Sequence, residues 1–158
     1  MLDDNGDVYL YLQKAPAEFF ERIVAILPMH IGFLSNKELV RTLEVLVKRE
    51  LGSDRLFQNY IYMRIERKVL QFSIKEYCRC VRALADKGHG DDRQFWQIVL
   101  RYVYERDKPK GAERRMAPLQ AKEVWESLIY LNLKCPEVDV TAALAQVEKS
   151  MGAAKQLE

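Results

Sequence analysis

Apolar side chains recur at every third or fourth position through most of the chain, as in the run Leu39, Leu43 and Leu46. Because an α-helix turns once every 3.6 residues, this spacing places them on one helix face. No segment shows the alternation typical of a half-buried β-strand followed by a hairpin turn. The pattern therefore predicts an all-α fold with helices over 16–30, 35–51, 54–69, 73–88, 92–106, 119–134 and 138–152.

The segment 34–67 is similar to the segment 72–105 at a constant offset of 38 residues, without a gap. Nine of the 34 aligned positions are identical, which is more than unrelated sequences share. The identical pairs are Ser35/Ser73, Lys37/Lys75, Glu38/Glu76, Arg41/Arg79, Leu46/Leu84, Gly52/Gly90, Asp54/Asp92, Arg55/Arg93 and Phe57/Phe95. Fainter similarity continues upstream at the same offset, and downstream at an offset of 47.

A repeated unit of this length is typical of a solenoid, in which each unit buries its apolar face against its neighbours. We therefore expect one right-handed α-solenoid domain of helix-turn-helix repeats over 1–152, with seven helices. The expected units lie near 8–33, 34–71, 72–118 and 119–152. The first unit lacks most of its first helix, so we expect the array to be truncated at that edge. Residues 153–158 are expected to form a disordered tail that ends in a cloning remnant, Leu157-Glu158.

The first helix of each unit begins with a capping box, in which a serine and a glutamate three residues later each satisfy a free backbone N–H. Ser35 with Glu38, and Ser73 with Glu76, fit this pattern. The glycines that follow these helices are expected to end them in a left-handed conformation; they are Gly52, Gly88 and Gly90. The aspartates expected to cap the second helices are Asp54, Asp92 and Asp139.

The formal net charge of +2 is unevenly distributed. Residues 34–118 carry 19 basic and 12 acidic side chains, a net charge of +7, and both flanking segments are acidic. A basic middle segment indicates a polyanionic partner. An ordinary charged helical surface is the alternative interpretation.

Residues that could perform catalysis are sparse. His30 and His89 are expected to lie at a helix boundary and in a turn, and Asp91-Asp92 is expected to cap a helix. The odd number of cysteines argues against a disulfide framework and favours a reducing compartment. Cys78 and Cys80 point about 200° apart on one helix, so we expect buried or half-buried thiols that cannot chelate one metal, and we expect Cys135 to be inert. The chain contains no phosphate-binding loop, dinucleotide-binding glycine pattern or nucleophile elbow. We therefore expect a non-catalytic protein without a cofactor, a metal, a small-molecule substrate or a membrane-spanning segment.

The first helices carry a stripe of cations on one side, because residues four, seven or eleven positions apart share a helix face. The stripe comprises Lys37, Arg41, Lys48, Lys75, Arg79 and Arg82. Corresponding helices of a solenoid stack along one face, so we expect these cations to form a ribbon suited to single-stranded RNA. A solvated or protein-binding face is the alternative. In the third copy Glu126, Ile129 and Leu133 replace most of the cations, so the ribbon should fade there.

A second basic cluster is expected in a long loop over 105–118. Its members are Arg106, Lys108, Lys110, Arg114 and Arg115. The aromatic residues of the second helices are expected to pack inside the fold rather than to stack on bases. They are Tyr60, Tyr62, Trp96, Tyr102 and Tyr104.

The repeated unit reads Leu or Phe, Ser, any residue, Lys, Glu and then helically spaced apolar residues, followed by a turn and Asp-Arg-x-Phe. This unit resembles the octotricopeptide and heptatricopeptide repeats of organellar RNA proteins and the FAST-kinase-like helical regions. The resemblance covers 16–152 and is clearest over 34–105. It implies a non-catalytic module that binds RNA or an RNA–protein complex in mitochondrial RNA processing, editing or translation.

Two functions follow as hypotheses. The first is contact with single-stranded RNA through the basic stripe. The second is a protein–protein scaffold that holds subunits of a mitochondrial RNA-processing or ribosomal assembly without touching RNA. Mitochondrial localisation is implied by the family resemblance alone.

Overall fold

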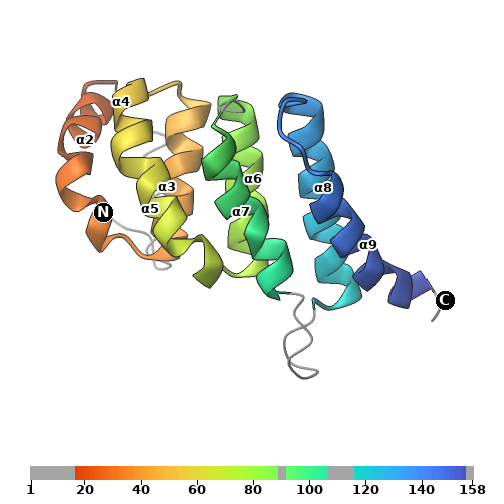
Figure 1. Cartoon of the computed structure of the whole chain (residues 1–158). Helices are drawn as coiled ribbons and strands as arrows, with labels where there is room; N and C mark the ends of the chain where they lie inside the picture. Colours follow the sequence, from red (N-terminus) through yellow and green to blue (C-terminus); the bar gives the residue numbers. More distant parts are fainter. Residues whose placement is uncertain (1–16, 89–91, 107–115, 156–158) are drawn as a thin grey trace. The chain divides into compact units, whose positions relative to one another are not determined.

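The computed structural model describes residues 17–88, 92–106 and 116–155, and within these ranges it contains helices and no β-strand (Figure 1). The chain divides into two compact units, residues 1–65 and 66–158. Each unit is described by itself below. The prediction of an all-α fold is confirmed for the described residues, whereas the solenoid arrangement, its handedness and its period stay predictions.

The described part of the first unit holds three successive helical segments around an apolar core. Its elements are α2 (Ala17–His30), the 3₁₀ turn η1 (Ile31–Phe33), α3 (Asn36–Lys48), α4 (Asp54–Leu56), the π-helical turn η2 (Phe57–Ile61) and α5 (Tyr62–Lys68), whose last residues cross into the second unit. The buried residues include Leu39, Leu43, Leu46, Phe57, Ile61 and Ile65. These are the apolar positions that the sequence pattern assigned to the core.

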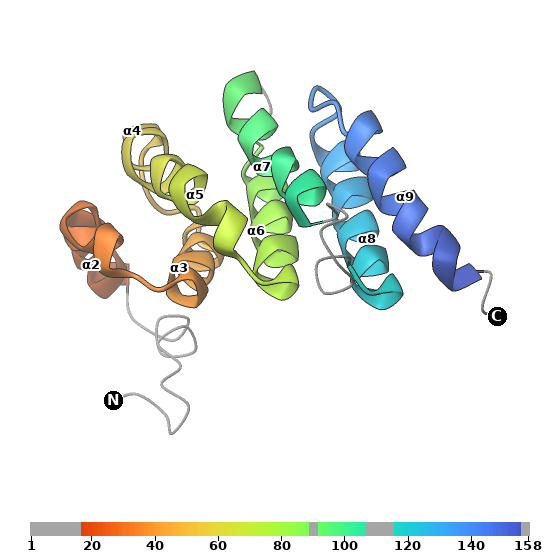
Figure 2. The same cartoon turned by 60° about the horizontal axis from the view of Figure 1, so that its bottom comes forward.

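The second unit pairs four long helices. After the 3₁₀ turn η3 (Val69–Gln71) come α6 (Ile74–Lys87), α7 (Arg93–Arg106), α8 (Pro118–Lys134) and α9 (Thr141–Lys155). Helix α6 lies beside α8, and α7 lies beside α9 (Figures 1 and 2). Within this unit, the first helices of two successive copies are therefore neighbours. Helix α9 runs past the predicted end at residue 152, and residues 156–158 lie outside the described ranges.

Both predicted capping boxes are present. The Glu38 N–H donates to Ser35 Oγ at 3.1 Å, and the Ser35 N–H donates to Glu38 Oε1 at 3.1 Å. The same pair of bonds joins Ser73 and Glu76, at 3.1 and 2.9 Å. The two serines also share one backbone conformation, with φ −67° and ψ 166° against φ −66° and ψ 165°. The two helices therefore start in the same way.

The predicted end of α3 is wrong in detail. Helix α3 is ended by Glu50, whose φ of 53° lies in the left-handed region, rather than by Gly52. The Leu51 N–H donates to the Leu46 carbonyl and the Glu50 N–H to the Val47 carbonyl, which is the pattern of a Schellman motif. Gly88 ends α6 with φ 79°, as predicted. Gly90 lies outside the described residues.

The second helices are capped by residues of more than one kind. Ser53, not Asp54, caps α4, because its Oγ accepts from the Leu56 N–H at 3.2 Å while Asp54 already belongs to the helix. Asp92 caps α7 as predicted and accepts from the Phe95 N–H at 3.1 Å. Asp139 accepts from the N–H of Thr141, the first residue of α9, at 3.0 Å.

Helix α8 begins one turn earlier than the repeat pattern suggests, and has Pro118 at its first position. It ends at Lys134, the residue that the offset of 47 aligns with Lys87 at the end of α6. The third copy of the repeat follows at an offset of 47 residues instead of 38, and part of these extra residues is therefore helical. Its capping box is half complete, because Gln120 accepts from the Ala117 N–H at 3.0 Å and the alanine has no oxygen to accept in return.

Replacing Glu50 by glycine should stabilise the first unit. A non-glycine residue in the left-handed region costs about 1–2 kcal/mol, and glycine would remove this cost. Part of the gain is offset because glycine loses more chain entropy on folding. We expect the free energy of unfolding in urea to rise by about 0.5–1 kcal/mol. The reverse change at the matching position, Gly88→Glu, should lower it. A decrease in stability for Glu50→Gly would contradict the Schellman motif.

Completing the capping box of α8 should also stabilise the protein. In Ala117→Ser the new hydroxyl would accept from the Gln120 N–H, as Ser73 does for Glu76, and should add about 0.5–2 kcal/mol to the free energy of unfolding. Ser73→Ala is the matched control and should lose a similar amount. Urea unfolding followed by circular dichroism measures both, and equal midpoints for Ala117→Ser and the wild type would refute the expectation.

Candidate nucleic-acid interface

The basic residues of the first unit lie on α3. Lys37 and Lys48 are exposed, and Arg41 is half-buried. Lys37 is the second residue of the helix, one position before the glutamate of the capping box. The two lysine side chains are therefore accessible to a ligand, whereas the Arg41 side chain is partly enclosed by the fold.

The basic residues of the second unit divide into two groups. Lys75 and Arg79 are exposed on the first half of α6. Arg82 turns toward α8, where its Nε donates to Ser127 Oγ at 3.3 Å and its guanidinium lies 5.3 Å from the centre of the Tyr130 ring. Arg82 thus joins two helices of its own unit and has less of its side chain left for an external phosphate than the sequence suggested.

The predicted ribbon of six cations draws on both units. α3 belongs to the first unit and α6 to the second. The structure gives each helix its own set of accessible cations. The joining of these sets into one ribbon stays a prediction.

The prediction that Arg106 lies in the loop of the second basic cluster is wrong. Arg106 is not a loop residue, because it is the last residue of α7. Its Nη2 donates to the Phe72 carbonyl at 2.6 Å, and its guanidinium lies 5.4 Å from the centre of the Tyr102 ring. The other members, Lys108, Lys110, Arg114 and Arg115, lie outside the described residues.

Most of the aromatic residues of the second helices pack inside the fold, as predicted. Tyr62, Trp96 and Tyr102 are buried, and Tyr60 is half-buried. Tyr104 is the exception, because 38% of it is exposed. Cys78 and Cys80 are buried free thiols, as expected from the sequence, and Cys135 is buried as well.

The centre of the second unit is a stacked pair of tyrosines. The rings of Tyr77 on α6 and Tyr102 on α7 lie 3.9 Å apart at an interplanar angle of 11°. The Tyr77 hydroxyl donates to the Val99 carbonyl at 2.8 Å, and the Tyr102 hydroxyl donates to the Phe72 carbonyl at 2.8 Å. Burial raises the pKa of Tyr77 well above its ordinary range and the pKa of Tyr102 to about 12.

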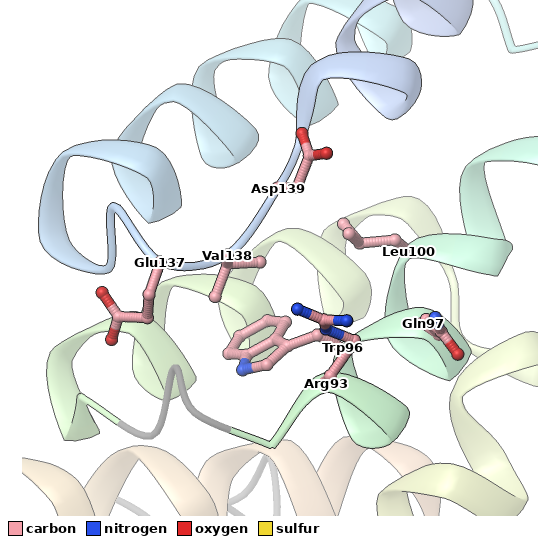
Figure 3. A pocket seen from close by; sticks show the side chains of 7 residues that line it. All are labelled: Arg93, Trp96, Gln97, Leu100, Glu137, Val138 and Asp139. Carbon is pink, nitrogen blue, oxygen red and sulfur yellow. The ribbon is translucent and has the colours of Figure 1, made fainter.

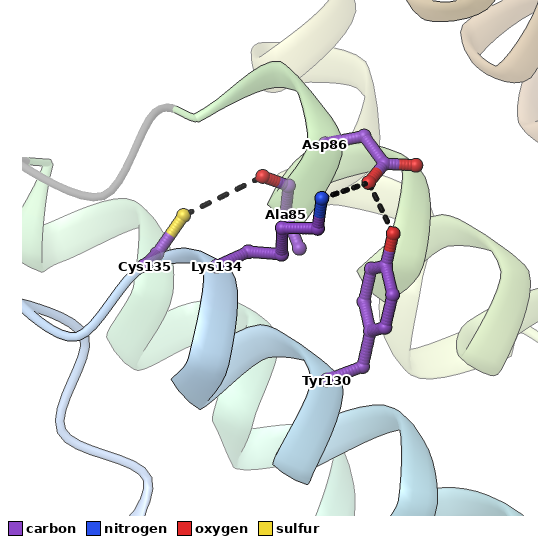
Figure 4. A network of polar contacts seen from close by, with 5 residues as sticks. All are labelled: Ala85, Asp86, Tyr130, Lys134 and Cys135. Carbon is purple, nitrogen blue, oxygen red and sulfur yellow. Dashed lines mark hydrogen bonds and ion pairs between the residues drawn. The ribbon is translucent and has the colours of Figure 1, made fainter.

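A polar cluster joins the last turns of α6 and α8 (Figure 4). The Tyr130 hydroxyl donates to Asp86 Oδ1, and Lys134 Nζ lies 3.9 Å from the same oxygen. The hydrogen bond to Asp86 raises the pKa of Tyr130. Cys135 Sγ lies 3.6 Å from the Ala85 carbonyl and extends the contact. Sequence reasoning missed this cluster, because only the register between α6 and α8 brings these side chains together.

A pocket of about 620 Å³ opens between the start of α7 and the connection from α8 to α9 (Figure 3). Its lining combines a cation, two carboxylates, an amide and apolar side chains; these are Arg93, Glu137, Asp139, Gln97, Trp96, Leu100 and Val138. The volume lies within the range of small-ligand sites. Arg93 belongs to the repeated Asp-Arg-x-Phe motif, in which it aligns with Arg55, but the sequence analysis predicted no pocket there.

Comparison with protein-family models, with curated proteins and with solved structures finds no match to this chain. Over the described residues, no group of three or more His, Cys, Asp or Glu side chains is placed to hold a metal ion. Within the same ranges, no helix is long and apolar enough to cross a membrane. His89 and Asp91 lie outside those ranges, and His30 ends α2 as expected.

The buried tyrosines should make the second unit sensitive to alkali. An unfolded tyrosine loses its proton near pH 10, whereas folded Tyr102 keeps it up to a pKa of about 12. Between these values the folded state holds more protons than the unfolded state, so the free energy of unfolding should fall as the pH rises.

Tyr102→Phe tests this expectation. The variant should lose about 1 kcal/mol near neutral pH, because the hydrogen bond to Phe72 is removed, but its stability should fall less steeply above about pH 10. Urea unfolding at several pH values measures both quantities. An unchanged alkaline slope would show that Tyr102 does not cause the loss of stability.

Proposed function

We propose that this protein is a non-catalytic helical-repeat module that binds single-stranded RNA, alone or within an RNA–protein complex. The supporting observation is the recurrence of exposed cations at matched positions of two helices that start in the same way. Lys37 follows the Ser35 cap, and Lys75 follows the Ser73 cap. Both lysines are exposed.

Lysine and arginine recognise phosphate in different ways. Lysine presents a compact charge on a flexible stem, and arginine presents a planar fork that also stacks on bases. The accessible cations are mainly lysines, joined by Arg79, so the chemistry favours contact with the phosphate backbone over base stacking. Arg82 contributes less because it is engaged with Ser127 and Tyr130.

RNA binding at one unit should strengthen RNA binding at the other, because both units belong to one chain. When one unit holds an RNA strand, the local concentration of that strand at the other unit rises, and two weak contacts combine into stronger binding. This effect depends on the length of the strand. We therefore expect short RNAs to bind more weakly than longer ones of the same composition.

The cellular role follows from the family resemblance. Octotricopeptide- and heptatricopeptide-like repeats imply organellar RNA processing, editing or translation, so we propose a mitochondrial setting. In that setting the module would hold RNA while other proteins act on it.

RNA binding through these cations should depend strongly on salt. With four contributing side chains (Lys37, Lys48, Lys75 and Arg79), the logarithm of the affinity should fall against the logarithm of salt concentration with a slope of roughly −2.8. Between about 50 and 200 mM salt, the affinity should drop by about fiftyfold. Fluorescence anisotropy with a labelled single-stranded RNA measures the slope.

The variant Lys37→Gln/Lys75→Gln identifies the residues responsible. Removing two phosphate contacts should reduce the magnitude of the slope by about 1.4. Lys149→Gln on α9 is the control, since it removes an exposed charge outside the basic stripe. Equal slopes for the double variant, the control and the wild type would refute a role for α3 and α6 in RNA binding.

Protein docking is the second candidate function, and a different observation favours it. Among the described residues, four large apolar side chains are more than 70% exposed, namely Met29 and Phe33 in the first unit and Leu119 and Leu133 in the second. Exposed apolar side chains that gather in patches mark protein contact surfaces. A scaffold that binds through them should show little salt dependence and no measurable affinity for RNA.

A further inference from the structure

We propose that the pocket between α7 and the α8–α9 connection binds a guanine base. This inference rests on the proposed function and names the base that the second unit would recognise in an RNA strand. It concerns Arg93, Glu137 and the apolar side chains between them, none of which belongs to the basic stripe of α3 and α6.

The two walls of the pocket carry opposite charges (Figure 3). Arg93 comes from the first turn of α7, and Glu137 comes from the connection that faces it. Among the described residues neither side chain has a hydrogen bond or an ion pair, so both remain available to a ligand. Asp139, on the same connection, is already held by the Thr141 N–H.

The space between these charged groups has apolar walls. Trp96 and Leu100 line the α7 side, and Val138 lines the connection. Trp96 and Val138 are almost fully buried and therefore fixed in place, with 3% and 4% exposed. A flat aromatic ring can lie against such walls while its polar edges reach the charged groups. A volume of about 620 Å³ leaves room for the attached sugar as well.

Guanine matches this distribution of charge. Its O6 and N7 atoms form an edge with two acceptors, and an arginine fork pairs with both of them. Its N1–H and N2–H₂ groups form an edge with two donors, which a carboxylate accepts. Adenine and cytosine each combine a donor with an acceptor on the edge that would face Glu137, and uracil offers two acceptors and one donor. Guanine is thus the base that satisfies Arg93 and Glu137 together.

The test compares short single-stranded RNAs of uridine that carry one central guanosine or one central adenosine. Affinity is measured by anisotropy in the full chain. The second readout is the fluorescence of Trp96 in a Trp125→Phe background, which removes the other tryptophan of the sequence. We expect the guanosine RNA to bind about tenfold more tightly than the adenosine RNA and to quench Trp96. Guanosine monophosphate is titrated in parallel, to distinguish a free nucleotide from a base in a strand.

Two variants locate the recognition. Arg93→Gln and Glu137→Gln should each reduce the preference for guanosine to about twofold or less, while the affinity for the adenosine RNA is unchanged. Arg101→Gln is the matched control, because Arg101 lies two turns further along α7 and pairs with Glu105 outside the pocket. It should keep the full preference.

The outcomes separate this inference from the proposed function. Equal affinity for the two RNAs, with the salt dependence of α3 and α6 intact, would overturn the guanine pocket and leave RNA binding standing. Binding of guanosine monophosphate without binding of any RNA would support the pocket and overturn the proposed function. A preference for guanosine that persists in both variants would place base recognition elsewhere and overturn the inference.

Discussion

The packing of α6 against α7 in the second unit depends on hydrogen-bond partners for two buried tyrosine hydroxyls. Tyr77 and Tyr102 stack within the core, and each hydroxyl needs a hydrogen-bond partner there, because an unsatisfied buried polar group costs about 1–3 kcal/mol. Backbone carbonyls supply both partners, one inside α7 and one at Phe72, just before α6. These bonds fix the position of α7 relative to the start of α6, and α7 in turn carries one wall of the pocket beside Arg93.

Three arginines form hydrogen bonds inside the fold of their own units. Arg64 donates to the Gly32 carbonyl at 2.8 Å, Arg106 donates to the Phe72 carbonyl, and Arg82 donates to Ser127. An arginine fork can bind a carbonyl with one arm while its plane packs on a neighbouring ring, which lysine cannot do. The stripe lysines Lys37, Lys48 and Lys75 are exposed instead. A count of cations in the sequence therefore overstates the surface that a polyanion meets.

Local features of the fold were predictable from the sequence, and contacts between distant segments were not. The capping boxes at Ser35 and Ser73 involve residues three positions apart, so their pattern was visible directly. Whether Glu50 or Gly52 ends α3 depends on the exact length of the helix, and helix propensities of single residues do not determine that length. The partner of Arg82 and the pocket beside Arg93 arise from the register of helices far apart in sequence. A single sequence contains no direct signal for that register.

Gly52 meets two independent restrictions at one position. Its φ of 88° suits glycine, and a Cβ atom there would lie 2.8 Å from Leu56 Cδ2 and 3.2 Å from the ring of Phe57. Gly88, at the corresponding end of α6, has a positive φ and open space around it. The two positions therefore differ in their tolerance of change: asparagine can take the place of Gly88 at small cost, whereas a side chain at position 52 would displace the buried side chain of Leu56.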